Sequence, residues 1–247
     1  MNDSNPPSAE VLGVRVDCVT VSQALDRCIQ LLNTDGHHQV VTLNSEFVMY
    51  AQHDASFRAL VRETDLVVPD GAGIVWAVRR QGKANIERVT GVDLMQDLCI
   101  QAAQQQIAVF LLGAAPGIAA QAAATLQAKI PGLVIAGTAV GAPDPDQAPE
   151  LCAQVRESGA GMLFVAFGCP AQDFWIQKYQ EKTGARLAMG VGGSFDYVSG
   201  TVARAPLWIQ RINLEWCYRL VRQPWRWRRQ RVLIAYLWKV LREKSSQ

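Results

Sequence analysis

This sequence of 247 residues lacks the cysteine and histidine spacing from which zinc sites are usually built. Its six cysteines are scattered without one C-x-x-C pair, and only three histidines occur. Structural zinc sites typically draw their ligands from such closely spaced pairs. A zinc site is therefore disfavoured, and unpaired cysteines of this kind are typical of reduced thiols in a cytoplasmic protein.

Long hydrophobic segments are also missing. No run approaches 18 consecutive apolar residues, and the N-terminus is polar, without the apolar core of a signal peptide. A helix that spans a bilayer needs about 20 largely apolar residues. We therefore expect a cytoplasmic protein without a membrane-spanning helix.

The fingerprints of two large nucleotide-binding classes are absent as well. No G-x-G-x-x-G follows the first predicted strand, and no G-x-x-x-x-G-K-[ST] occurs anywhere. This disfavours an NAD-dependent oxidoreductase, which stays as an alternative, and a P-loop protein. Asp144-Pro145-Asp146 formally matches the D-x-D that binds a metal in many sugar transferases. Its prolines favour an exposed turn instead, so we expect no metal.

Charge is divided unevenly along the chain. Residues 201–247 hold eleven Lys and Arg against two acids and five of the seven tryptophans, whereas residues 1–200 hold thirteen bases and twenty acids. We therefore expect an acidic core over 1–200 and a basic, tryptophan-rich helical appendage over 201–247.

Short apolar runs alternate with amphipathic stretches through most of the chain. Strands are expected near 11–16, 39–43, 66–68, 107–112, 133–138, 162–167 and 187–191, with helices between them. This alternation is typical of a parallel sheet covered on both faces. The predicted fold is α/β, a Rossmann-like, mostly parallel sheet with helices on both faces plus the basic C-terminal appendage.

Polar residues and glycines follow several of these strands. Their carboxyl ends meet at one edge of a parallel sheet, which is where open α/β sheets bind ligands. The residues expected there are Thr42, Asn44, Asp70, Gly113, Gly168, Gly192 and Gly193. Glycine turns and helix N-termini suit phosphates, although glycine also follows strands for steric reasons alone. Asp70 itself has two interpretations, and its position alone favours a cap on the helix from about Ala72.

The appendage predicts two helices, near 207–222 and 225–244. Basic side chains and tryptophans on amphipathic helices favour an anionic membrane surface or a lipid diphosphate over nucleic acid, because the apolar faces are continuous. We expect no nucleic-acid partner, and a basic nucleic-acid-binding module stays as a second alternative function. The candidate membrane and lipid-diphosphate residues are Arg204, Arg211, Arg219, Arg222, Arg228 and Arg231.

An ordered set of motifs over residues 11–231 resembles the WecG/TagA/CpsF family of bacterial glycosyltransferases. The motifs are Thr42-Leu43-Asn44, Pro69-Asp70-Gly71-x-Gly73, Glu87-Arg88-Val89-x-Gly91-x-Asp93-Leu94, Leu111-Leu112-Gly113, Gly168-x-Pro170-x-Gln172, Gly190-Val191-Gly192-Gly193-x-Phe195-Asp196, Arg204-Ala205-Pro206 and Leu214-Glu215-Trp216-x-Tyr218-Arg219-Leu220. The family often has P-K-Q-E at the fifth motif, where Ala171 and Asp173 replace Lys and Glu here. The shorter acid, Asp173, is expected to change the contacts to the donor.

The resemblance implies inverting, metal-independent transfer of a sugar, often of the N-acetylmannosamine type. The donor would be a UDP-sugar and the acceptor a saccharide on undecaprenyl diphosphate, in cell-surface polysaccharide or teichoic acid synthesis. It implies an enzyme at the inner face of the membrane and leaves a homo-oligomer open. Asp70 would act as the base, a role that reverses the preference for a cap. Thr42, Asn44, Arg88 and Gln172 would lie around the substrates, and Gly113, Gly168, Gly192, Gly193 and Asp196 would bind the UDP-sugar.

Overall fold

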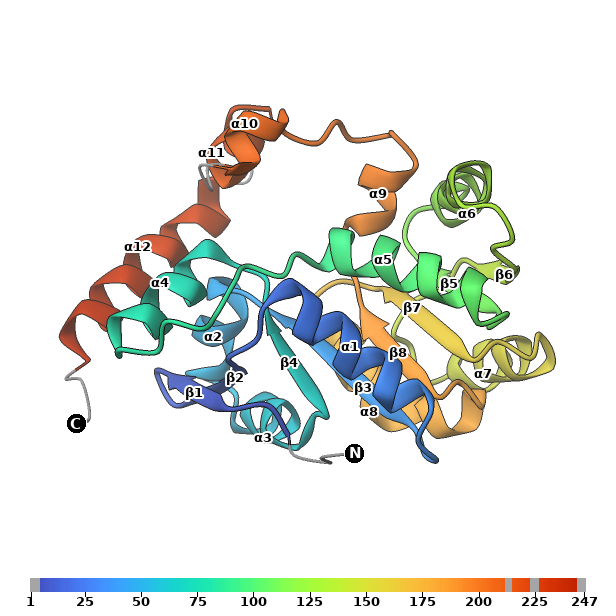
Figure 1. The fold of residues 1–247 in the computed structure, drawn as a ribbon, viewed down its shortest axis with the longest axis horizontal. Helices are drawn as coiled ribbons and strands as arrows, with labels where there is room; N and C mark the ends of the chain where they lie inside the picture. Colours follow the sequence, from blue (N-terminus) through green and yellow to red (C-terminus); the bar gives the residue numbers. More distant parts are fainter. Residues whose placement is uncertain (1–4, 212–214, 223–226, 244–247) are drawn as a thin grey trace.

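A six-stranded parallel sheet forms the centre of the protein (Figure 1). The computed structural model describes residues 5–211, 215–222 and 227–243. The strands lie in the order β4-β3-β8-β7-β5-β6. Their bounds are β3 (His38–Leu43), β4 (Leu66–Pro69), β5 (Val109–Gly113), β6 (Ile135–Ala139), β7 (Met162–Ala166) and β8 (Leu187–Gly190).

Helices cover both faces of this sheet, so the predicted fold class is confirmed. One face carries α1 (Val21–Leu32), α5 (Gly91–Gln104), α6 (Ile118–Lys129) and α9 (Ser194–Val198). The other carries α2 (Ser45–Ala51), α3 (Ala55–Glu63), α4 (Ala72–Arg80), α7 (Ala148–Glu157) and α8 (Ala171–Thr183). Because both faces are covered, β4, β5 and β7 are buried along their whole length, as continuous apolar strands require.

The first predicted strand is wrong. Residues 11–16 do not form one strand but contribute to an antiparallel pair, β1 (Ser8–Val11) and β2 (Val14–Asp17). The chain reverses at Leu12 and Gly13, which have φ angles of 50° and 74°. Val11, Val14 and Val16 are all buried, so the alternation that suggested a single strand comes from two strands facing the same core.

The adjacent strands β3 and β8 create the crevice that positions the site. They are hydrogen-bonded neighbours, but α2, which follows β3, covers one face and α9, which follows β8, covers the other. Where successive helices leave on opposite faces, a parallel sheet opens a crevice beyond the carboxyl ends of its strands. The residues just after β3, β4, β7 and β8 therefore meet in one place.

The basic C-terminal region forms α10 (Leu207–Arg211), α11 (Glu215–Arg222) and α12 (Trp227–Arg242) (Figure 1). Helix α12 packs into the same hydrophobic core as α2 and α4 through Tyr236 and Val240. The Tyr236 hydroxyl donates to the Gly73 carbonyl at 3.0 Å, and Glu243 accepts from the Leu12 amide at 3.0 Å. None of the helices in the described ranges combines the length and apolar character needed to cross a bilayer.

Replacing Tyr236 tests whether α12 is a structural part of the core. Its side chain is fully buried, so Tyr236→Ala should lower the free energy of unfolding by about 3–5 kcal/mol. Tyr236→Phe removes only one hydrogen bond and should cost about 1 kcal/mol. Urea unfolding measures both values. The exposed Trp238 on the same helix is the control, and a cost for Trp238→Ala as large as that for Tyr236→Ala would contradict the packing.

Candidate functional site

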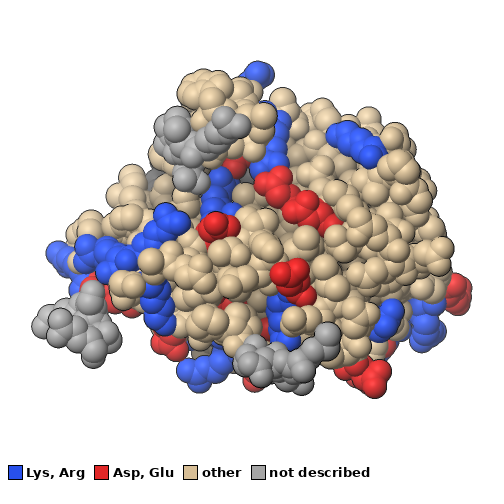
Figure 2. All heavy atoms as spheres, in the orientation of Figure 1, with Lys and Arg blue, Asp and Glu red and all other residues tan. Residues whose placement is uncertain are grey.

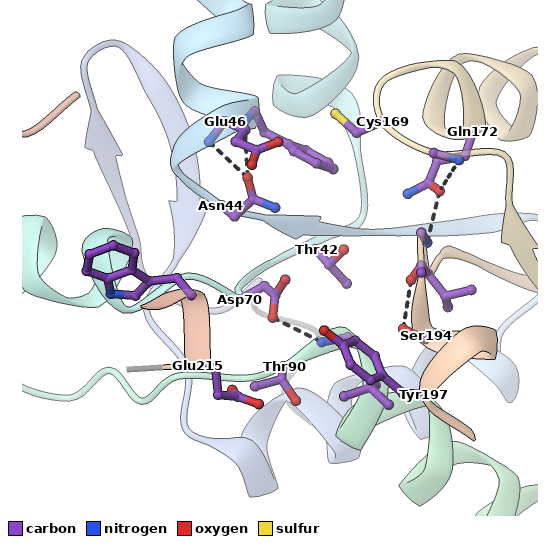
Figure 3. A pocket seen from close by; sticks show the side chains of 18 of the residues that line it. Thr42, Asn44, Glu46, Asp70, Thr90, Cys169, Gln172, Ser194, Tyr197 and Glu215 are labelled. Carbon is purple, nitrogen blue, oxygen red and sulfur yellow. Dashed lines mark hydrogen bonds between the residues drawn. The ribbon is translucent and has the colours of Figure 1, made fainter. Parts of the chain in front are cut away.

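A cavity of about 330 Å³ lies at the carboxyl edge of the sheet (Figure 3). It brings together residues that follow β3, β4, β7 and β8 with residues from the basic C-terminal region. Of the residues expected at the sheet edge or around the substrates, it is lined by Thr42, Asn44, Asp70, Arg88, Gly168, Gln172, Gly192 and Gly193. It is also lined by Arg204, which was expected at a lipid diphosphate or a membrane surface. Chain segments separated by more than 160 residues therefore line the same cavity.

Asp70 lies in the middle of this cavity and does not cap the following helix. The N-cap of α4 is Gly71, so no side chain caps the start of this helix. The Asp70 backbone amide donates to the Leu43 carbonyl at 2.9 Å, which joins it to the end of β3. Its Oδ1 instead accepts from the Gly91 amide at 3.2 Å, in the first turn of α5. The capping interpretation based on position is thus wrong for α4.

Opposing effects set the pKa of the Asp70 carboxyl. Loss of hydration raises it, and the positive charge of Arg88 and the hydrogen bond from Gly91 lower it. The loss of hydration outweighs these two effects, and the negative charges of Glu215 and Asp93 raise the pKa slightly further. The pKa of the Asp70 carboxyl is therefore about 6. A helix N-terminus alone would stabilise the carboxylate and weaken it as a base. Here the carboxyl titrates close to neutral pH, as suits a general base.

Thr42 and Asn44 are held by β3 and by the helix that follows it. The buried Thr42 hydroxyl donates to the Gly190 carbonyl on the neighbouring strand β8 at 3.2 Å. Asn44 caps α2, and its Oδ1 accepts from the amides of Glu46 and Phe47 at 2.9 and 3.3 Å. The Asn44 oxygen is therefore committed to the helix, and its NH₂ is the group that it can offer to a ligand.

Gln172 joins the two glycine turns on the opposite side of the cavity (Figure 3). Its Oε1 accepts from the Gly168 amide at 3.1 Å and from the Gly192 amide at 3.0 Å. Gly168 and Gly192 have φ angles of 81° and 52°, a backbone region that favours glycine. A side chain fully buried at 1% exposure thereby fixes the loops after β7 and β8.

A chain of ion pairs connects the basic C-terminal region to the sheet edge. Arg88 Nη2 lies 2.6 Å from Glu215 Oε2, and Arg204 Nε lies 3.1 Å from Glu215 Oε1. Arg204 also contacts both carboxylate oxygens of Asp93, at 2.5 and 2.7 Å. Burial would raise the pKa of Asp93, but hydrogen bonds from Arg204 and Thr90 outweigh it and lower the pKa.

Some expected site residues lie outside the cavity wall. Gly113 is one, and its role is steric, because a Cβ there would lie 2.8 Å from the Phe167 ring and 3.0 Å from the Ala166 carbonyl. Asp196 on α9 and Arg222 on α11 also do not line the cavity. The Arg222 guanidinium instead lies 5.5 Å from the Tyr218 ring centre. The side chains of the other candidate arginines lie outside the described residues, namely Arg211, Arg219, Arg228 and Arg231.

The cavity also contains residues that were not predicted as site residues, although Glu215 and Trp216 belong to the last of the family motifs. Glu215 and Trp216 enter from the start of α11, and Thr90 and Tyr197 from the chain around α5 and α9. Glu215 carried a usable signal, because it is one of only two acids among residues 201–247. An isolated acid in a basic segment indicates a specific partner, here Arg88 and Arg204.

Ala171 and Asp173, the two residues that depart from the family pattern, do not line the cavity. Of these two, Asp173 has the unusual surroundings. It is fully buried, and neither carboxyl oxygen bonds another residue in the described part of the chain. Burial raises its pKa to about 8, so the group is protonated at neutral pH. A Cβ at Gly190 would lie 2.8 Å from Asp173 Oδ1 and 2.5 Å from Gln172 Nε2. Asp173 can therefore affect a ligand through Gln172 and the end of β8.

Comparisons with known proteins agree with the geometry. The family model described as the glycosyl transferase WecG/TagA/CpsF family matches residues 9–247. A Bacillus spizizenii protein named N-acetylglucosaminyldiphosphoundecaprenol N-acetyl-beta-D-mannosaminyltransferase is 36% identical over 207 residues, which cover 84% of this chain and 80% of that protein. A Bacillus subtilis protein of the same name is 31% identical over 208 residues, with the same coverage.

The Asp173 carboxyl should make stability fall as pH rises from about 5 to 8. The folded protein holds a proton up to pH 8 that the unfolded chain releases near pH 4, so the folded state loses stability across that window. Asp173→Asn should remove up to about 1.4 kcal/mol of this loss per pH unit. Urea unfolding at several pH values measures it. Asp35→Asn on an exposed loop should keep the wild-type slope, and an unchanged slope in Asp173→Asn would contradict a buried, protonated acid.

Proposed function

The chain belongs to the WecG/TagA/CpsF family of glycosyltransferases, and we propose that it transfers an N-acetylmannosamine-type sugar from a UDP-sugar to N-acetylglucosamine on undecaprenyl diphosphate. The names of its relatives support this acceptor and this sugar. The UDP carrier and inversion at the anomeric carbon are part of the proposal. An oxidoreductase or a nucleic-acid-binding module would not account for membership in this family.

The observation that carries the proposal is the position of Asp70 in the cavity with a pKa of about 6. Inverting transfer needs a base that takes the proton of the acceptor hydroxyl as its oxygen attacks the anomeric carbon. The new C–O bond forms while the bond to the UDP oxygen breaks, and UDP leaves with the electron pair. Asp70 Oδ2 is the oxygen that we assign to the proton, because Oδ1 is bonded to the Gly91 amide.

The glycine turns after β7 and β8 are the proposed place for the donor diphosphate. Gly168, Gly192 and Gly193 line the cavity opposite Asp70, and α8 begins three residues after Gly168. The Gly168 and Gly192 amides already donate to Gln172, so we assign the phosphate oxygens to the Gly193 amide and to the start of α8, because a helix N-terminus attracts anions. The leaving diphosphate gains negative charge, and Arg204 is a cation that lines the same cavity. We expect this arrangement to act without a metal ion.

Asp70→Asn tests the base. It should lower kcat by about 10²–10⁴ and leave the KM of the UDP-sugar within threefold, because the amide keeps the shape of the side chain. For the wild type, kcat/KM should fall tenfold per pH unit below about pH 6, since protonated Asp70 cannot accept a proton. Release of UDP from UDP-N-acetylmannosamine, with a diphosphate-linked N-acetylglucosamine acceptor, measures each quantity.

Asp144→Asn is the matched control, because Asp144 is exposed outside the cavity. It should leave turnover unchanged, as should addition of EDTA. More than a tenth of wild-type activity in Asp70→Asn would exclude Asp70 as the base. A strong loss in Asp144→Asn together with inhibition by EDTA would exclude metal-independent transfer.

We also infer that α10, α11 and α12 hold the enzyme against an anionic membrane surface. Six large apolar side chains on the described parts of these helices are between 54% and 77% exposed: Leu207, Trp208, Val221, Ile234, Trp238 and Leu241. Lys and Arg side chains gather at the left flank of Figure 2, over the region of α4 and α12 in Figure 1. Apolar residues that enter the lipid boundary beside bases near anionic headgroups are typical of an interfacial element.

The double variant Trp208→Ser, Val221→Ser should bind vesicles that contain phosphatidylglycerol at least tenfold more weakly than the wild type. Each substitution removes an exposed apolar side chain that would enter the lipid boundary. Cosedimentation at several lipid concentrations measures the partition constant. Val134→Ser, which removes an apolar side chain 51% exposed just before β6, should bind like the wild type. Equal binding by all three proteins would refute the inference that these helices hold the enzyme at a membrane surface.

A further inference from the structure

A second cavity of about 460 Å³ adjoins the first. Residues shared by both cavities form the boundary between them: Asn44, Glu46, Asp70, Arg88, Glu215 and Trp216. Apart from Trp216 this boundary is polar, and it contains the proposed base. A ligand that reaches Asp70 from the second cavity therefore does not have to pass through the glycine turns where we place the donor.

The rest of the second cavity is largely apolar. Its walls are the first turns of α4, with Trp76, and one face of α12, with Leu233 and Leu237. Trp76, Leu237 and Trp216 are 38%, 37% and 41% exposed. Large apolar side chains left in contact with water around a concave surface are typical of a site for an apolar ligand.

Helix α12 extends this apolar wall away from the boundary. Leu233, Leu237 and Leu241 are spaced four residues apart, so they lie on one face of the helix. Exposure increases along this row, from the partly buried Leu233 to Leu237 at 37% and Leu241 at 56%. Leu241 is also one of the residues that we place at the membrane. The row therefore leads from Asp70 towards the proposed lipid surface.

We propose that the second cavity binds the isoprene units of the acceptor lipid next to its diphosphate. This inference rests on the proposed function, which requires one molecule that carries a sugar, a diphosphate and a long apolar chain in that order. The two cavities present matching chemistry in the same order. Asp70 and Asn44 contact the sugar, and Arg88 at the boundary binds the diphosphate. The apolar walls formed by α4 and α12 contact the isoprene units.

The shared position of Arg88 supports this order. Its Nε donates to the Asp70 carbonyl at 2.9 Å, and Glu215 holds its guanidinium at 2.6 Å, so the cation is fixed beside the base. An acceptor anchored at Arg88 and along α12 would place its sugar at Asp70 while the donor occupies the far side of the first cavity. Both substrates could then be bound together, as direct in-line transfer requires.

Binding of geranyl diphosphate, which has two isoprene units and no sugar, tests the site without turnover. Calorimetry on the full-length wild-type protein should show at least tenfold tighter binding of geranyl diphosphate than of inorganic pyrophosphate. Leu237→Gln should reduce this preference to less than threefold and leave pyrophosphate binding unchanged. Ile234→Gln is the matched control, because Ile234 lies on the same helix, is 72% exposed and does not line the cavity. It should keep the wild-type preference.

Trp76→Gln, on the opposite wall, gives the same test should the α12 variant fail to fold, and it should also abolish the preference. Equal binding of both probes by the wild type would overturn the site, as would an equal loss in Ile234→Gln. The UDP-release assay separates this outcome from failure of the proposed function. Turnover without a preference for geranyl diphosphate refutes the lipid site alone, whereas the preference without turnover on the diphosphate-linked acceptor refutes the transferase reaction alone.

Discussion

Four charged side chains of alternating sign hold the site together. Arg88, Glu215, Arg204 and Asp93 form a continuous chain with contacts of 2.5–3.1 Å, and its two acids come from segments more than 120 residues apart. Removal of Glu215 would leave the partly buried Arg88 without its ion-pair partner, and removal of Arg204 would do the same to Asp93. Such a loss costs more than loss of an exposed pair. Through this chain the basic C-terminal region becomes a wall of the cavity, with Trp216 beside Asp70.

Two acids show how their surroundings divide the roles of identical side chains. Asp70 opens to the cavity and keeps a hydrogen bond from Gly91, so its pKa of about 6 leaves it ionised at neutral pH. The buried Asp173 carboxyl has no hydrogen bond from another residue in the described part of the chain, and its pKa of about 8 leaves it protonated. The first can accept a proton from a substrate, and the second fills space under Gly190 and Gln172.

The sequence predicted the sheet edge well, because the carboxyl ends of parallel strands must converge. Eight residues chosen on that ground or by resemblance line one cavity: Thr42, Asn44, Asp70, Arg88, Gly168, Gln172, Gly192 and Gly193. Contacts that depend on tertiary packing were not predictable. Arg204 was expected at a lipid or membrane surface, but its partner Asp93 lies 111 residues away, and no local pattern encodes that distance. The turn at Leu12 was missed because leucine rarely adopts a positive φ.

The contact between Tyr236 and Gly73 has a consequence for chains that end early. The Gly73 carbonyl that accepts from Tyr236 lies three residues after Asp70, and a Cβ at Gly73 would lie 3.2 Å from the tyrosine ring. A truncation before α12 would uncover the core around α2 and α4 and release the turn that carries Asp70, the carboxyl that we propose as the base. Loss of activity in such a shortened protein would therefore report damage to the active site as much as loss of lipid attachment.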